Sequence, residues 1–350
     1  MIYYDTTKMG AAKHRSGLVR LSSRLREELG PAVTTVAWDG RRRAFVAGLA
    51  REPVKFTATD WLFTVELFSE LERPGFAAFV HNPPCRLAAM FHDAIPVRHP
   101  HITWPQSVQR HPEYMKLLAG FERTWAISAA TQRDFMEFWR WQGVITRATV
   151  DVIELGADFD GGSRVQRDPV VPPGQPVLLC VGIIEPRKNQ AFLLDVGAAL
   201  WAAGLDFELH IVGRMNPHFG APIVARMQRL QKREPRFRYH AAAGDRELGR
   251  LYAAARAVVL PTIAEGCGLP LLEALWRGVP CVCSDLPVLR ENADGGGCLL
   301  AAANDAADWQ ARLRTVLTDA AECRRLQQEA MARPLPRWTD TAQILLKALR

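Results

Sequence analysis

The stretch Glu265–Glu273, which reads EGCGLPLLE, decides the fold expected of this 350-residue chain. An apolar run over 257–260 precedes it, and a short helical pattern follows it as far as Gly278. This order predicts a buried strand, a glycine-rich loop and a helix that begins at the loop. The backbone N–H groups and the positive end of such a helix can approach a phosphate. The two carboxylates can then accept hydrogen bonds from hydroxyls of a nucleotide or sugar.

The whole second half repeats this alternation of strands and helices. Such spacing is typical of a parallel sheet covered on both faces, in which ligands bind beyond the carboxyl ends of the strands. Asp245 is expected to be the N-cap of one helix. The strands are expected at 177–182, 207–213, 237–241, 257–262 and 281–284, and the helices at 189–203, 221–233, 246–255 and 270–277.

The first half is less regular but fits the same α/β plan. We expect strands at 2–5, 33–38, 77–80, 88–91, 126–128 and 149–155, and helices at 17–29, 115–125 and 131–140. Four aromatic residues in and just after the last of these helices have a spacing that usually fills a core. They are Phe135, Phe138, Trp139 and Trp141.

Length and composition predict two domains. A chain of 350 residues exceeds the usual size of one domain, and the stretch before Pro176 is rich in Gly, Pro and charge. We expect an N-terminal domain over 1–160, a linker over 161–175 and a C-terminal domain over 176–335. The last segment, 336–350, is expected to be a helix, with packing back onto the N-terminal domain left open.

Charge and cysteine content narrow the class of protein. The net charge of +7 is spread over both halves, whereas a nucleic-acid binder more often carries one basic patch. A mild excess of positive charge is better suited to binding phosphorylated small substrates or an anionic membrane surface. Seven irregularly spaced cysteines with no CxxC pair indicate a reducing compartment and no zinc site. No leader or membrane-spanning run is evident, so we expect a cytoplasmic protein.

Three motifs together resemble retaining glycosyltransferase family four. They are the segments 181–189 (VGIIEPRKN), 265–273 and 285–291 (DLPVLRE), and weaker matches occur at 92–96, 127–128 and 155–158. The resemblance is strongest over about 176–297. It implies the GT-B architecture, in which two Rossmann-like domains with parallel sheets face a central cleft.

The resemblance also implies site residues. Arg187 and Lys188 would neutralise the departing diphosphate, and cations at a helix start oppose the helix dipole, which favours a functional role over a merely solvated loop. Glu265 would contact the donor sugar and Glu273 the ribose. Cys267 stands where the family often has an aromatic residue. The remaining donor-binding positions are Gly17, Gly182, Gly266, Gly268 and Leu269.

His92 is the fourth residue expected to be catalytic. In the family, a histidine at this place lies near the donor sugar. A lone histidine after a strand is more often structural, but Asp93 and Pro96 around it favour the functional interpretation.

The implied reaction is retaining transfer of a hexose to a lipid-linked or oligosaccharide acceptor in surface polysaccharide assembly, in the manner of bacterial mannosyltransferases. GDP-mannose is the favoured donor and a UDP-hexose the alternative. No metal and no cofactor are expected. A GT-B sugar-nucleotide epimerase and a catalytically silent GT-B partner protein stay open as rivals.

A peripheral contact at the inner face of the membrane also stays open. The basic residues Lys13, Arg20 and Arg24 near the first helix could touch anionic lipid headgroups, or they simply form a solvated face.

Overall fold

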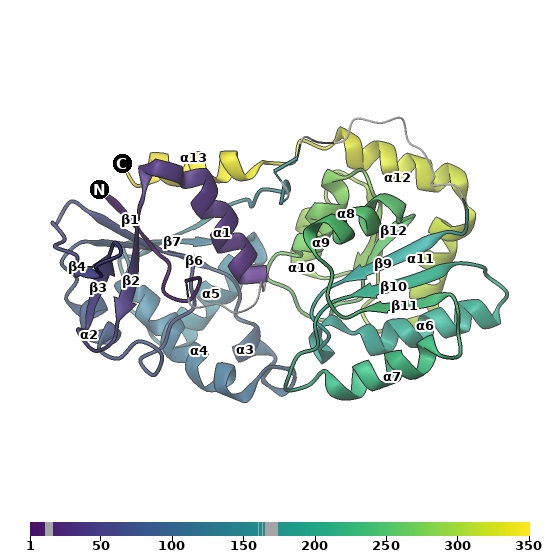
Figure 1. Ribbon diagram of the computed structural model, residues 1–350, viewed down its shortest axis with the longest axis horizontal. Helices are drawn as coiled ribbons and strands as arrows, with labels where there is room; N and C mark the ends of the chain where they lie inside the picture. Colours follow the sequence, from purple (N-terminus) through teal and green to yellow (C-terminus); the bar gives the residue numbers. More distant parts are fainter. Residues whose placement is uncertain (11–16, 160, 163, 165–173) are drawn as a thin grey trace. The chain divides into compact units, whose positions relative to one another are not determined.

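The computed structural model describes residues 1–10, 17–159, 161–162, 164 and 174–350 (Figure 1). The chain divides into two compact units, each built around one β-sheet. The first unit combines Met1–Gly156 with Pro336–Arg350, and the second comprises Ala157–Leu335. Most of the segment expected as a linker, 161–175, lies outside the described residues.

The first unit contains an eight-stranded sheet with the order β4-β3-β2-β1-β5-β6-β7-β8. Its strands run parallel except at one edge, where β3 is antiparallel to both β2 and β4, so the expected all-parallel sheet is correct only for the other six strands. The strand bounds are β1 Ile2–Asp5, β2 Thr34–Asp39, β3 Ala44–Ala47, β4 Glu52–Pro53, β5 Trp61–Thr64, β6 Arg86–Phe91, β7 Arg123–Ala126 and β8 Thr149–Val152.

Two expectations for the first unit are wrong. Residues 77–80 belong to helix α2 (Phe76–His81), which buries Phe76 and Val80 four positions apart, a helical spacing that the short apolar run concealed. The helix expected over 115–125 ends early, because a 3₁₀ turn closed by Gly120 follows Leu117 and β7 comes next. The other helices of this unit are α1 Gly17–Leu29, α3 Ile95–Arg98, α4 Pro105–Leu117, α5 Ala129–Trp141 and α13 Trp338–Ala348.

The second unit follows the predicted alternation closely. Its six strands are all parallel, with the order β11-β10-β9-β12-β13-β14. The strands are β9 Val177–Val181, β10 Glu208–Val212, β11 Phe237–His240, β12 Ala257–Leu260, β13 Cys281–Ser284 and β14 Cys298–Ala301. The helices are α6 Gln190–Ala202, α7 Ala221–Gln231, α8 Asp245–Ala254, α9 Leu269–Trp276, α10 Pro287–Ala293, α11 Ala306–Thr318 and α12 Ala320–Ala332. Asp245 is the first residue of α8, and Gly244 takes the N-cap position expected for it.

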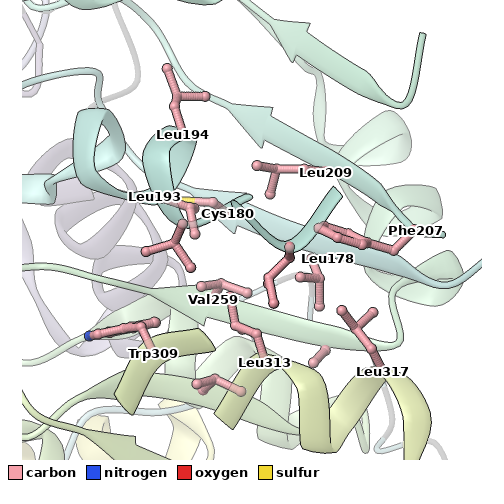
Figure 2. Packing of buried hydrophobic residues seen from close by; sticks show 14 of the residues in the cluster. Leu178, Cys180, Leu193, Leu194, Phe207, Leu209, Val259, Trp309, Leu313 and Leu317 are labelled. Atoms are coloured by element: carbon pink, nitrogen blue, oxygen red, sulfur yellow. The ribbon is translucent and has the colours of Figure 1, made fainter. Parts of the chain in front are cut away.

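Alternate residues of the second sheet enter one apolar core (Figure 2). Leu178 and Cys180 of β9 lie in it with Val259 of β12. Helices α6 and α11 cover this face with Leu193 and Leu313. Each fully buried side chain of this size stabilises the fold by about 1.5–3 kcal/mol. The core therefore fixes the positions of β9 and β12, whose carboxyl ends carry the predicted site.

An aromatic core fills the first unit. Phe91 of β6 stacks on Phe135 of α5 with ring centroids 4.1 Å apart, and Phe138 and Trp139 are also buried. Trp141 departs from the expectation because it is 75% exposed. It is the last residue of α5, where the helix ends and the chain turns away from the core.

Helix α13 belongs to the first unit although it comes last in the sequence. It packs against α1, and the Thr339 hydroxyl donates to Glu28 at 2.9 Å. The Thr341 hydroxyl donates to the carbonyl oxygen of Glu154 at the same distance. Gly156 meets this helix directly, because a Cβ atom there would lie 2.2 Å from the backbone nitrogen of Trp338.

Candidate functional site

Two loops come together where the strand order of the second sheet changes direction. β10 lies on one side of β9 and β12 on the other, and in sheets of this kind ligands bind in the crevice at such a switch point. The loop after β9 carries Arg187 and Lys188, and the loop after β12 carries Glu265. The structure thus brings together three of the four residues expected to be catalytic.

Arg187 is held by three groups. Its Nε and Nη2 atoms lie 2.9 and 2.8 Å from Glu185 Oε1. Its Nη1 donates to the carbonyl oxygen of Ala264 at 2.9 Å and lies 3.3 Å from Glu265 Oε2. The side chain keeps 20% of its surface exposed. The guanidinium group is therefore fixed in orientation while part of it still faces solvent, which suits a preorganised anion-binding group.

Lys188 and Glu265 form a second ion pair, between Nζ and Oε1. The Glu265 side chain is only 7% exposed. Burial by itself would raise the pKa of this carboxyl, but the positive charges of Lys188 and Arg187 outweigh burial and hold the pKa below its usual value. Glu265 is therefore ionised at neutral pH and can act only as a hydrogen-bond acceptor.

The glycine-rich loop between Glu265 and α9 is tightly packed. Gly268 has a φ of +82°, and a Cβ atom there would lie 2.5 Å from Leu289 Cδ2, so a larger residue would have a strained backbone and would have to displace the Leu289 side chain. Cys267 is buried, and Asn292 Nδ2 donates to its carbonyl oxygen. Burial raises the pKa of the Cys267 thiol to about 12, which makes it a packing group rather than a reactive one. Gly266 is also buried.

Helix α9 begins at Leu269, next to the loop, and Glu273 is its fifth residue. Glu273 is 2% exposed, so the expectation of a buried acid among apolar neighbours agrees with its burial. Arg277, one turn later, donates from Nη1 to the Glu273 carbonyl oxygen at 3.2 Å.

Gly182 follows β9, and a Cβ atom there would lie 3.5 Å from the side-chain carbons of Lys188, which is ordinary contact. Glycine is required more strictly at Gly213, after β10, because a Cβ atom there would lie 1.8 Å from the Gly182 carbonyl oxygen. The sequence analysis did not single out Gly213.

Three further polar residues support the two loops. Asn216 Nδ2 donates to Glu185 Oε2 at 2.8 Å. The Thr262 hydroxyl lies 3.0 Å from the carbonyl oxygens of both Arg187 and Ala264. Sequence reasoning missed all three. An acid two positions before Arg187 was a usable signal for Glu185, whereas nothing in the sequence pointed to Asn216 or Thr262.

His92 and Gly17 belong to the first unit. His92 follows β6, is 4% exposed, and its Nε2 lies 2.6 Å from the Val65 carbonyl oxygen. A carbonyl can only accept, so Nε2 carries the hydrogen, and burial lowers the pKa of the ring. His92 is therefore a neutral imidazole with Nδ1 as its remaining acceptor. Gly17 begins α1, is exposed, and would have no described atom within 4 Å of an added Cβ.

Two further features of the described residues bear on the kind of site and on membrane insertion. Within the described ranges, no three His, Cys, Asp or Glu side chains are grouped so that they could hold a metal ion. Among the helices of that same part of the chain, none combines the length and apolar character needed to cross a bilayer.

Relatives of known name match this chain over part of their length. The serotype-specific mannosyltransferase WbdA of Escherichia coli is 29% identical over 265 residues, which is 70% of this chain but 32% of WbdA. The O-antigen chain mannosyltransferase B of Escherichia coli is 35% identical over 142 residues, or 40% of this chain and 36% of the relative. This chain thus spans about a third of the length of either protein.

Residues 175–319 match the family described as Glycosyl transferases group 1. The fold is shared with sucrose-phosphate synthase from Thermosynechococcus elongatus, with 17% identity, a TM-score of 0.74 and coverage of 99% of this chain and 97% of that one. The predicted family resemblance and the predicted GT-B fold of two Rossmann-like units are confirmed.

Proposed function

We propose that the chain is a retaining, metal-independent hexosyltransferase. It moves a hexose, mannose favoured, from a nucleotide-diphosphate sugar to a lipid-linked or oligosaccharide acceptor in surface polysaccharide assembly. The observation that carries the proposal is the pair Arg187 and Lys188, fixed at the switch point of the second sheet by Glu265. The nucleotide sugar is a substrate, and the proposal includes no other cofactor.

The chemistry follows from where charge develops. When the bond between the sugar and the diphosphate breaks, negative charge accumulates on the departing phosphate oxygen. Two cations that are already oriented stabilise this charge without reorganising. Glu265, ionised and buried beside them, accepts hydrogen bonds from sugar hydroxyls. Glu273 binds the ribose in this proposal, and His92, in the first unit, serves the sugar through Nδ1 or its backbone.

The stereochemical course rests on the family resemblance. In the same-face reaction that we propose, the departing phosphate accepts the proton of the acceptor hydroxyl. No side chain forms a bond to the sugar. A covalent sugar adduct trapped on the protein would contradict this course.

The donor is proposed from the relatives, two of which are named mannosyltransferases. GDP-mannose is therefore preferred to a UDP-hexose. A thermal-shift series with GDP, UDP, ADP and CMP separates the two, because a ligand that binds only the folded state raises the melting temperature in proportion to the logarithm of its excess over Kd. If GDP gives the largest shift, GDP-mannose is supported as the donor. If UDP gives the largest shift, the donor is a UDP-hexose instead.

The decisive experiment is the double variant Arg187→Ala/Lys188→Ala, assayed by mass spectrometry with a panel of donors and acceptors. Arg312→Ala is the matched control, because Arg312 is paired with Asp308 in the same unit, outside the three motifs, and is 46% exposed. The double variant should lose transfer while the control keeps it. If the double variant still transfers the hexose, the proposal is wrong. A free altered sugar released without acceptor indicates the epimerase, and no turnover with any donor by the unmodified chain indicates the silent partner protein.

We further propose a cytoplasmic protein that contacts the inner face of the membrane. All seven cysteines are free thiols, which suits a reducing compartment. Of the residues first expected to touch lipid, Arg24 is less suited to it because it is paired with Glu27 and Glu28. Lys13 lies outside the described residues.

The end of α5 fits this contact better. Trp141 is 75% and Ile145 99% exposed, and the exposed Arg140 and Arg147 lie in the same short stretch of chain. Exposed apolar side chains beside cationic ones match an interface of anionic headgroups over acyl chains. We call residues 140–147 the Trp141 segment.

A further inference from the structure

The strand order of the first sheet also changes direction, between β1 and β5. A group of buried charges lies at the carboxyl ends of these two strands. Asp5 ends β1 and is 0% exposed, Glu66 lies two residues beyond the end of β5 and is 6% exposed, and Arg73 is 1% exposed. Buried charges are costly unless they are paired, so their presence at a ligand-binding edge calls for an explanation.

Arg73 bridges the two acids. Its Nη1 donates to Asp5 Oδ2 at 2.6 Å and its Nη2 to Glu66 Oε2 at 2.5 Å. Asp5 Oδ2 also accepts from the Thr64 hydroxyl at 2.8 Å. The bridge therefore links the last residue of β1, the last residue of β5 and the segment that follows β5.

Glu66 in turn holds the chain that leaves β1. The backbone nitrogen of Lys8 lies 2.8 and 2.7 Å from the two carboxylate oxygens of Glu66, and that of Met9 lies 2.8 Å from Oε1. Each of these contacts is made by an N–H donor. An ionised carboxylate can accept them all, whereas a protonated carboxyl would turn a hydroxyl toward a donor. The observed arrangement is thus that of ionised Glu66.

The ionised and protonated forms of Glu66 are comparably populated near neutral pH. Burial and the negative charge of Asp5 raise the pKa of Glu66 to about 7, although Arg73 and the two backbone N–H groups oppose the rise. Tyr4 of β1 also faces this group, and burial raises the pKa of its hydroxyl, so it stays neutral. The ammonium group of Lys8 turns away to Glu72 Oε2, at 3.0 Å.

We propose that Glu66 is a positioning residue whose carboxylate fixes the backbone of Lys8 and Met9 at the ligand-binding edge of the first sheet, and that uptake of one proton releases this backbone. His92 also helps to hold the segment that carries Glu66, because it donates to the carbonyl oxygen of Val65, the residue before Glu66. The inference deepens the proposed function, on which its activity readout rests.

The test compares Glu66→Gln with Glu72→Gln. Glu72 contacts the same Lys8, but through the side chain, and it is 33% exposed, so the control removes an equal charge without touching the backbone of residues 8 and 9. For the unmodified chain, kcat/KM should fall about tenfold between pH 8 and pH 6, as the ionised fraction of a group with a pKa near 7 does. Glu66→Gln should be low and flat over this range, and Glu72→Gln should follow the unmodified chain.

A second readout needs no substrate. Hydrogen exchange of the Lys8 and Met9 amides, expressed as protection relative to the free peptide rate, should drop about tenfold from pH 8 to pH 6 in the unmodified chain. It should be low at both pH values in Glu66→Gln and unchanged in Glu72→Gln. Protection that does not vary with pH in the unmodified chain overturns the inference. The expected exchange pattern without any glycosyl transfer would leave the positioning role standing and reject the proposed function.

Discussion

Arg187 Nη1 and Glu265 Oε2 lie 3.3 Å apart, although 78 positions separate them in the sequence. The contact exists because β9 and β12 are neighbouring parallel strands, so their following loops leave the sheet at the same edge. Both partners are mostly buried, at 20% and 7% exposure. The pair is therefore a property of the topology, and the predictions for the second unit start from it.

Replacing Glu265 by Gln should destabilise the second unit by about 3 kcal/mol at pH 7, because two cations lose a buried counter-charge. A carboxyl with a folded-state pKa below its unfolded value stabilises the fold above the unfolded value and loses that contribution as the pH falls through the folded value. The difference between the two proteins should therefore shrink from pH 7 to pH 4. Urea denaturation at both pH values measures it, and an equal difference at both would contradict the ionised pair.

Gly268→Ala should cost more stability than Gly204→Ala. Both glycines have a φ above +80°, but an added Cβ would meet Leu289 Cδ2 at 2.5 Å in the first case and nothing within 4 Å in the second. The left-handed φ alone costs about 1–2 kcal/mol for a residue with a Cβ, and overpacking adds about 1–3 kcal/mol. Melting temperatures of the two variants give the comparison. Equal losses would show that Leu289 yields without cost.

His92 should stay neutral below pH 6.5 with its hydrogen on Nε2. Burial lowers the pKa of this ring in the folded state, while the unfolded chain takes up a proton near the ordinary value. The unfolded state thus binds more protons below pH 6.5, and stability should fall as the pH falls. Nitrogen NMR of histidine-labelled protein, with His92→Asn to assign the signal, reports both the tautomer and the titration. A signal that titrates near 6.5 would be inconsistent with the buried Val65 contact.

Trp141→Ala/Ile145→Ala should weaken binding to anionic vesicles at least tenfold, because each side chain contributes about 1.5–3 kcal/mol when it leaves water. Vesicle sedimentation with and without anionic lipid measures this. Leu49→Ala is the control, since Leu49 is fully exposed in the same unit but outside the Trp141 segment. If both variants bind equally, the contact lies elsewhere. If the unmodified chain self-associates as its concentration rises and the double variant does not, the Trp141 segment contacts another protein molecule instead of the membrane.

Five strands of the second sheet could be predicted because they are apolar runs separated by helices with clear stops, whereas the edge strand β14 was not predicted. The interval from Cys281 to Ser284 agrees residue for residue with the prediction. The first sheet was harder. Trp61–Thr64 is a central strand that escaped notice, because three apolar residues and a threonine without a helical or alternating pattern carry little signal of their own.

The residues of the two ligand-binding edges were also predictable only in part. Arg187, Lys188 and Glu265 were predicted through short motifs whose residues stand next to glycines or helix starts. Glu66 and Arg73 were not predicted, because their partners are Asp5 and the backbone of the chain that follows it. Nothing local in the sequence marks an acid that binds backbone N–H groups from a segment 58 positions away.

Helix α13 gives the first unit a part that comes from the far end of the chain. Its Trp338, Ala342 and Leu345 are buried in that unit, at 0%, 2% and 0% exposure. A protease that cuts once between the two units would thus leave an amino-terminal fragment that lacks a piece of its own interior, which the carboxyl-terminal fragment still carries. The halves of the nicked protein should co-migrate until denaturant parts them, and the amino-terminal half should not refold in isolation as it does in the intact chain.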